Sequence, residues 1–208
     1  MPEGICYIVG AGRHFPGDTF APAPEDLVIA ADGGYADLLS RGIRVDLLLG
    51  DMDSLGEKIP QGPSVERFAP QKDDTDTLLA IKTGLQRGYR AFHLYGGTGG
   101  RLDHTLANCQ CLLYLARRGA RGWLHGEREV VTAVVDGELE LPPRKAGYLS
   151  VFCLGDRAEG VTLEGLKYPL ENAVLTADFP LGVSNEFTGA KSRIAVRHGA
   201  LLVVLQTV

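Results

Sequence analysis

Two aspartates follow one of the apolar runs of this 208-residue chain. The stretch VDLLLGDMDSL places Asp51 and Asp53 directly after a short run of the kind that forms a buried strand. Carboxylates at positions i and i+2 of an extended segment point the same way, so both can bind one ion. Mg²⁺ takes carboxylate oxygens together with water and phosphate oxygens. The spacing therefore favours a divalent cation at the end of this strand.

Further acidic residues follow the same pattern. Asp32 comes after the run DLVIAA, and the stretch KDDTDT at residues 72–77 supplies Asp73, Asp74 and Asp76 just before a helical pattern. Taken singly, each is better explained by helix capping or solvation, and Asp74 would be an ordinary N-cap. Capping explains only one acid at each helix end, however, so the set as a whole favours a metal site.

A glycine-rich stretch, GGTGGRLDH at residues 96–104, leaves a strand pattern and enters a helix pattern. Glycines let backbone N–H groups approach an anion closely, and a helix N-terminus adds favourable potential. Arg101 could clamp phosphate oxygens through two hydrogen bonds. The stretch matches neither GxGxxG nor GxxxxGK[ST], and by itself a tight turn explains it equally well. Beside the acidic cluster, it supplies the phosphate half of a nucleotide site.

For two other polar residues, a role in the site and an ordinary structural or solvated role explain the sequence about equally well. Lys72 is a second cation near the expected phosphates, but a solvated lysine explains it about as well. His104 lies in the first turn of its helix, where a structural role is as good an explanation as a catalytic one, so we assign it no role as a base.

The secondary structure that would position these residues differs between the two halves of the chain. From residue 1 to about 122, short apolar runs alternate with helical patterns, which predicts a mostly parallel sheet with helices on both faces. Ligands of such sheets bind beyond the carboxyl ends of the strands. In the last helical pattern, Leu102, Leu106, Cys109 and Leu113 share one apolar face.

After about residue 122 the helical pattern disappears, and short β-rich runs are separated by Gly, Pro and Asn. This spacing predicts a small antiparallel β-sandwich or barrel. We therefore expect an α/β domain that binds nucleotide and metal at residues 1–122, followed by an all-β domain at residues 123–208.

Composition excludes several classes of protein. The formal net charge of −5 provides no basic field for nucleic acid, and no apolar run reaches the roughly 20 residues of a membrane span. The four cysteines form no CxxC pair and no zinc-ligand spacing. The N-terminus lacks the basic region of a signal peptide. We expect a cytoplasmic protein.

The motifs together resemble those of the thiamine pyrophosphokinase (thiamin diphosphokinase) family. The matching stretches are ADGGYADLL, DLLLGDMDSL, KDDTDT, GGTGGRLDHTLAN, GLKYPL and LGVSNEF. They occur in the family's order, with the same α/β-then-β layout, from about residue 30 to the C-terminus. The earlier stretch GAGRHFPGD at residues 10–18 matches none of these motifs.

The resemblance implies ATP-dependent transfer of a pyrophosphoryl group to the hydroxyl of thiamine, giving thiamine diphosphate and AMP. It implies a homodimer, with sites between the α/β domain of one subunit and the β domain of the other. The implied positions are the Mg²⁺ ligands Asp51, Asp53 and Asp76; the ATP-binding residues Asp32, Lys72, Asp73, Thr75, Gly97, Gly100, Arg101 and Asp103; and the thiamine-pocket residues Tyr168, Ser184 and Asn185.

The residue types suit these roles. An aromatic face at Tyr168 suits the thiazolium cation of thiamine, although a half-buried strand aromatic would explain this tyrosine without the family match. Arg101 would hold phosphates, and Asp76 or Asp73 would accept the hydroxyl proton. The choice between β- and γ-phosphorus rests on the resemblance alone. Two other functions stay open: a different Mg²⁺–ATP phosphotransferase acting on a hydroxylated small molecule, and a non-catalytic regulator that binds thiamine or nucleotide.

Overall fold

The computed structural model describes residues 3–17, 20–31, 33–50, 64–65 and 74–206. The chain divides into two compact units, Met1–Cys111 with Gly119–Glu127, and Leu112–Arg118 with Arg128–Val208. The domain boundary expected at residue 122 stays a prediction, and it falls within a strand of the first unit.

The first unit is built on a parallel sheet, in which the strand order is β6–β5–β1–β2–β3–β4. The register pairs Val9 with Tyr95 and Ala31 with Leu49. Because all of these strands run the same way, their carboxyl ends meet at one edge of the sheet. The strands are β1 (Ile5–Val9), β2 (Leu27–Ala31), β3 (Leu47–Leu49), β4 (Ser64–Val65), β5 (Ala91–Tyr95) and β6 (Arg121–His125).

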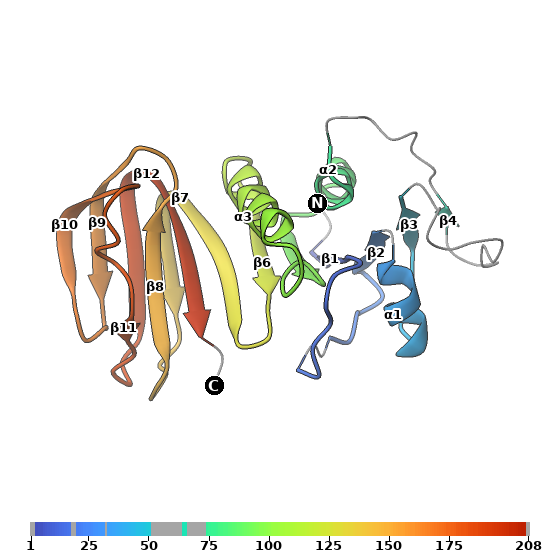
Figure 1. The fold of residues 1–208 in the computed structure, drawn as a ribbon, viewed down its shortest axis with the longest axis horizontal. Helices are drawn as coiled ribbons and strands as arrows, with labels where there is room; N and C mark the ends of the chain where they lie inside the picture. Colours follow the sequence, from blue (N-terminus) through green and yellow to red (C-terminus); the bar gives the residue numbers. More distant parts are fainter. Residues whose placement is uncertain (1–2, 18–19, 32, 51–63, 66–73, 207–208) are drawn as a thin grey trace. The chain divides into compact units, whose positions relative to one another are not determined.

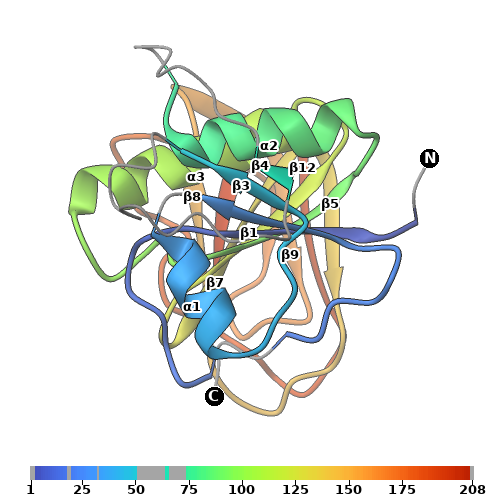
Figure 2. The same ribbon diagram turned by 90° about the vertical axis from the view of Figure 1, so that its right-hand side faces the viewer.

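The described residues contain three helices: α1 (Gly34–Ser40) and α2 (Asp76–Gln86), which lie in the first unit, and α3 (Leu102–Ala116), which begins in it (Figure 1). Figure 2 shows α1 and α2 on opposite sides of β1. At Gly84, α2 lies so close to the sheet that a Cβ would be 2.6 Å from the Phe92 ring and 2.8 Å from Cys6 Sγ. Since α1 is a single helix of seven residues, the fuller expectation of helices covering both faces stays a prediction.

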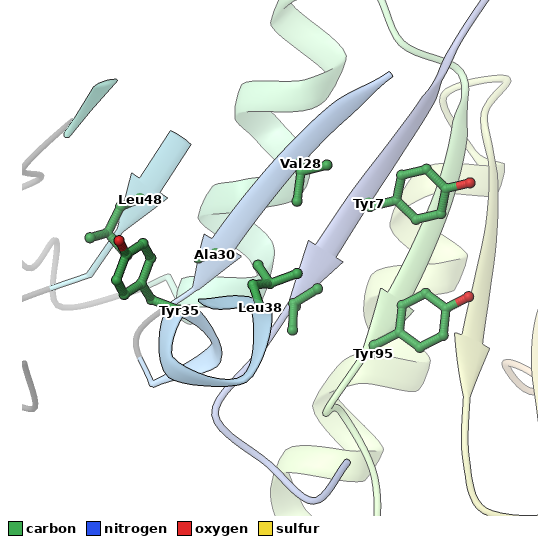
Figure 3. Close-up of a cluster of buried hydrophobic side chains, with 8 residues drawn as sticks. Tyr7, Val28, Ala30, Tyr35, Leu38, Leu48 and Tyr95 are labelled. Atoms are coloured by element: carbon green, nitrogen blue, oxygen red, sulfur yellow. The ribbon is translucent and has the colours of Figure 1, made fainter. Parts of the chain in front are cut away.

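The core under α1 is apolar and well packed. Tyr35 and Leu38 of α1 join side chains from four strands, and Figure 3 shows Tyr35 next to Leu48 of β3. Val28 and Ala30 of β2 are fully buried in this cluster. Burying a side chain of leucine size contributes about 1.5–3 kcal/mol. This packing fixes the strands whose ends carry the site.

Five aromatic rings on β1, β5, β6 and the segment before β2 form a closed circle of contacts, in which four pairs are stacked and Tyr7–His93 is tilted by 40°. Tyr95 lies against His125 with ring centroids 4.3 Å apart, and His93 Nδ1 lies 2.8 Å from His125 Nε2, within hydrogen-bonding distance. Burial lowers the pKa of His93, and it lowers the pKa of His125 to about 4. The neighbouring rings are, in order, Tyr7, Phe20, Tyr95, His125 and His93.

The second unit is antiparallel. Its longest strand, β12, pairs with three others, β7, β8 and β9. A register shift between Val196 and Ala200 lies between the part of β12 that pairs chiefly with β9 and the part that pairs with β8. The strands are β7 (Glu129–Leu141), β8 (Tyr148–Cys153), β9 (Arg157–Glu164), β10 (Leu170–Thr176), β11 (Asn185–Glu186) and β12 (Ser192–Gln206).

The order of parallel strands followed by antiparallel strands is therefore confirmed. The expected sandwich or barrel stays a prediction. None of the described helices is long and apolar enough to span a membrane.

The apolar face expected on α3 is only partly buried. Leu102 and Leu106 are 71% and 58% exposed, whereas the buried side chains of this helix include Asn108, Leu112 and Leu115. The buried stripe contains a polar residue, Asn108, because its amide group hydrogen-bonds the preceding turn. A pattern of apolar residues alone therefore indicated the wrong face at the start of the helix.

Candidate functional site

A cavity of about 380 Å³ lies in the first unit, at the carboxyl end of its parallel strands. Its walls come from four segments: residues 10–12 after β1, residues 74–77 at the start of α2, residues 96–98 and 100–101 after β5, and residues 104–105 and 107–108 of α3. Ala31 at the end of β2 completes them. Helix N-termini carry partial positive charge and unpaired N–H groups. The arrangement therefore favours an anionic ligand.

The start of α2 contributes a cap and a carboxylate. Thr75 is the N-cap, and its Oγ1 accepts a hydrogen bond of 3.2 Å from Leu78 N. Asp76 is the first residue of the helix and lines the cavity. The expectation that Asp74 would cap this helix is wrong, because its carboxylate instead pairs with Lys82 Nζ at 2.6 Å. Thr75 and Asp76 thus lie in the cavity wall, and their roles near a nucleotide stay predictions.

The glycine-rich turn after β5 is held from α3. Gly96 and Gly99 have φ of +65° and +74°, a backbone region that glycine adopts without strain. Asn108 Nδ2 donates a 2.9 Å hydrogen bond to the Gly97 carbonyl. Thr98 is buried in the cavity wall, and its Oγ1 has no hydrogen-bond partner among the described residues. A buried hydroxyl without a partner costs free energy.

Arg101 is paired but accessible. Its guanidinium donates to Asp103 through Nε at 3.1 Å and Nη2 at 2.5 Å, and this lowers the pKa of the Asp103 carboxyl. Arg101 lines the cavity together with Gly97, Gly100 and His104. The Arg101 side chain is 74% exposed, and such a surface pair contributes little stability. Arg101 could therefore turn towards a phosphate at small cost.

A second glycine turn, at residues 10–12, was missed in the sequence. Gly10 N donates to Tyr95 O at 2.9 Å, and Gly12 N donates to Gly96 O at 3.0 Å. A Cβ on Gly12 would lie 2.2 Å from Gly96 O, so only glycine allows this approach. The available signal was GAG at the end of an apolar run, because every parallel strand ends at the same edge. Residues 10–12 thus form a wall of the cavity that faces the expected turn.

Part of the expected metal and nucleotide set lies outside the described residues: Asp32, Asp51, Asp53, Lys72 and Asp73. Within the described ranges, no group of three or more His, Cys, Asp or Glu side chains is placed to hold a metal ion. The three-aspartate metal site therefore stays a prediction.

The expected thiamine-pocket residues lie in the second unit. Tyr168 is 56% exposed, while Asn185 is buried. Asn185 Oδ1 accepts from Tyr168 N at 2.9 Å, and its Nδ2 donates to Tyr168 O at 2.7 Å. Ser184 has φ of 60°, and its N donates to Ser150 Oγ at 3.0 Å. Asn185 thus holds the backbone of Tyr168, and the tyrosine ring is left accessible.

Two family models match the chain. The model described as "Thiamin pyrophosphokinase, catalytic domain" covers residues 23–124, and "Thiamin pyrophosphokinase, vitamin B1 binding domain" covers residues 138–201. The chain belongs to the thiamin pyrophosphokinase family. The resemblance found in the sequence is confirmed, and so is the expectation of an enzyme of this class.

Individual relatives agree with the family models. The thiamine pyrophosphokinase of Bacillus subtilis is 28% identical over 187 residues, which cover 87% of each chain. Its crystal structure superimposes with a TM-score of 0.86 over 98% of both chains. Thiamin pyrophosphokinase from Geobacillus thermodenitrificans is 27% identical, with a TM-score of 0.84 and 98% of both chains covered. The catalytic-domain match begins after residues 10–12, so this wall of the cavity lies outside the matched range.

Proposed function

We propose that this member of the thiamin pyrophosphokinase family transfers a pyrophosphoryl group from ATP to the hydroxyl of thiamine, giving thiamine diphosphate and AMP. The observation that carries the proposal is the cavity of the first unit, where two helix N-termini and two glycine turns converge beside Arg101 and Asp76. Family membership supplies the substrates.

The cavity walls suit a polyphosphate. The N-termini of α2 and α3 provide favourable potential for negative charge, and the glycine turns let the chain approach phosphate oxygens closely. Arg101 donates two parallel hydrogen bonds to Asp103, and a phosphate presents the same kind of paired acceptors. Phosphoryl-type transfer depends mainly on positioning and charge stabilisation, which these groups supply.

The proposed Mg²⁺ ligands are Asp51, Asp53 and Asp76. The position of Asp76 is compatible with this role, since Asp76 lines the cavity at the start of α2. Leu49 is the register partner of the cavity residue Ala31 and precedes Asp51 by two positions, which supports Asp51 as a ligand. Bound Mg²⁺ would neutralise charge on the phosphates. Asp32, Lys72, Asp73, Thr75, Gly97, Gly100 and Asp103 complete the proposed nucleotide contacts.

The second unit would bind thiamine through the exposed ring of Tyr168, which suits the thiazolium cation by stacking and cation–π attraction. Ser184 and Asn185 are the other proposed pocket residues. Because the Asn185 amide already holds both backbone groups of Tyr168, its contribution would be to position that ring. Asp76 or Asp73 would accept the hydroxyl proton.

We further propose a cytoplasmic homodimer with sites at the subunit interface. The described part of the second unit exposes several large apolar side chains, which supports an association surface. These residues are Tyr148, Phe152, Tyr168, Val174, Phe179, Leu181 and Val183. Sedimentation of the purified protein tests this assembly, and a monomer at micromolar concentration would contradict it.

Incubation of the purified protein with thiamine, ATP and Mg²⁺, followed by chromatographic separation of AMP and ADP, tests the activity. We expect AMP to form only when thiamine is present. Thiamine-dependent ADP would instead indicate an ordinary kinase. Thiamine binding without any nucleotide product would indicate a regulator.

A further inference from the structure

The turn at residues 10–12 is joined to the glycine turn after β5 by more than backbone hydrogen bonds. His14 reaches back over both turns: its Nε2 lies 2.9 Å from Gly10 O. Because a carbonyl oxygen only accepts, Nε2 carries the hydrogen of this bond. On Gly96, a Cβ would lie 2.7 Å from the Cε1 atom of His14, so the ring packs directly on the second turn.

The other side of the His14 ring is anchored on α1. Nδ1 lies 3.5 Å from Asp37 Oδ2, and the same oxygen lies 2.8 Å from Arg41 Nε. Asp37 Oδ2 is buried and has no hydrogen-bond partner among the described residues, so Arg41 and His14 Nδ1 are its polar neighbours. The His14 side chain is 16% exposed. The mostly buried ring of His14 therefore lies between α1 and the two glycine turns of the cavity wall.

We propose that His14 is a positioning residue for the nucleotide: through the Gly10 carbonyl and the Gly96 turn it holds the two glycine walls at the spacing that the phosphates require. The inference rests on the proposed function, and it concerns a segment that none of the matched motifs includes. Small displacements of groups that orient a substrate can weaken catalysis considerably. His14 itself is absent from the cavity walls, so its effect is exerted through Gly10 and Gly96.

Two substitutions separate the two contacts of the ring. In His14→Gln, the amide nitrogen lies where Nε2 lies, so the hydrogen bond to Gly10 is kept and the contact with Asp37 is lost. In His14→Asn, the shorter amide stays near the Nδ1 position, so Asp37 keeps a partner and Gly10 loses its donor. If His14 only stabilises the fold, both variants should affect kinetics alike.

The measurement is a set of initial rates over ATP and thiamine concentrations, with ATP titration calorimetry and thermal unfolding of each variant. We expect His14→Asn to raise the KM and Kd for ATP about fivefold, which corresponds to about 1 kcal/mol, the size of one hydrogen bond. The KM for thiamine and kcat should change less than about twofold in both variants. His14→Gln should keep the wild-type KM for ATP within about twofold.

Equal KM values for ATP in the Asn and Gln variants would overturn the positioning role, as would an equal rise of both substrates' KM. A wild-type protein that binds no ATP in the calorimeter would overturn the proposed function and this inference with it. Wild-type protein that binds ATP and forms AMP, with an unchanged Kd in His14→Asn, would overturn the inference alone.

Discussion

The two units differ in which parts of the chain form their proposed ligand sites. In the first unit, the cavity is formed largely by backbone: two glycine turns and the N-termini of α2 and α3. In the second unit, an exposed ring, Tyr168, is presented by a buried amide, Asn185. At Gly12 and Gly96 a Cβ would meet a backbone carbonyl oxygen at 2.2 Å and 2.5 Å, whereas the exposed ring of Tyr168 leaves room for exchange. We therefore expect substitutions in the first unit to weaken ligand binding through steric clashes or loss of charge. In the second unit we expect the effect to depend on the side chain of Tyr168.

We expect the largest effect when a charged group is removed from the cavity of the first unit. Asp76→Asn keeps the shape of the first residue of α2 but removes the carboxylate at the cavity. We expect kcat to fall at least about 100-fold, because a proposed Mg²⁺ ligand and candidate base is lost. Asp74→Asn, which loses the ion pair with Lys82, should lower kcat less than about fivefold. Equal losses in the two variants would show that general negative charge matters and not Asp76.

The steric requirement of the cavity is tested where the turn at residues 10–12 comes closest to the glycine turn after β5. In Gly12→Ala the new Cβ would meet the Gly96 carbonyl oxygen at 2.2 Å, so the walls must separate. We expect kcat/KM for ATP to fall about 30–100-fold, as misplaced substrate groups do in other enzymes. Gly17→Ala is the control, because a Cβ there has no heavy atom within 4 Å. Near-wild-type kinetics in Gly12→Ala would remove residues 10–12 from the site.

In the second unit, Asn185→Leu removes the amide that holds Tyr168. Two backbone groups of Tyr168 lose their partners, so the free energy of unfolding should fall by about 1–3 kcal/mol. The KM for thiamine should rise, and the KM for ATP should stay within about twofold. Lys191→Ala, which removes an exposed pair with Glu140, should change stability by less than about 1 kcal/mol. A rise in the KM for ATP alone would contradict the assignment of thiamine to this unit.

A smaller effect concerns the stacked rings beside the first sheet. The pKa of His125 is lowered to about 4 by burial, so between pH 6.5 and 4 the unfolded chain binds more protons than the folded one. Stability should therefore fall as pH falls through this window, by an amount up to about 3 kcal/mol. His125→Phe keeps a ring in the stack and should lose less stability between pH 6.5 and 4. Denaturant unfolding at several pH values measures this, and parallel curves for the two proteins would contradict it.

Much of the architecture could be predicted from the sequence, because parallel and antiparallel strands leave different patterns. Continuous apolar runs ending on Gly or Asp predicted the first sheet, and the motifs around Asp76 and Arg101 predicted residues that the structure places in the cavity wall. The exposed face of α3 was not predicted, because Asn108 is buried by a hydrogen bond to Gly97 that no periodicity reveals.

The turn at residues 10–12 was missed for a similar reason. Its role depends on β1 lying beside β5, a pairing between segments about 85 residues apart. Asp74 was expected to cap α2, but its carboxylate pairs with Lys82, eight residues along the chain in the same helix, and Thr75 is the cap. Local patterns thus predicted which residues are polar at the site, and side-chain pairing in the folded chain decided what each of them contacts.

The central claim is that the first unit binds ATP and the second unit binds thiamine. The most direct test measures initial rates of AMP formation over a grid of ATP and thiamine concentrations for Arg101→Ala and Tyr168→Leu. We expect Arg101→Ala to raise the KM for ATP about tenfold and to leave the KM for thiamine unchanged. Tyr168→Leu should raise the KM for thiamine about fivefold and leave the KM for ATP unchanged. If both variants raise the KM of the same substrate, the assignment of ATP to the first unit and thiamine to the second is wrong. It is also wrong if Arg101→Ala leaves the KM for ATP unchanged and Tyr168→Leu leaves the KM for thiamine unchanged.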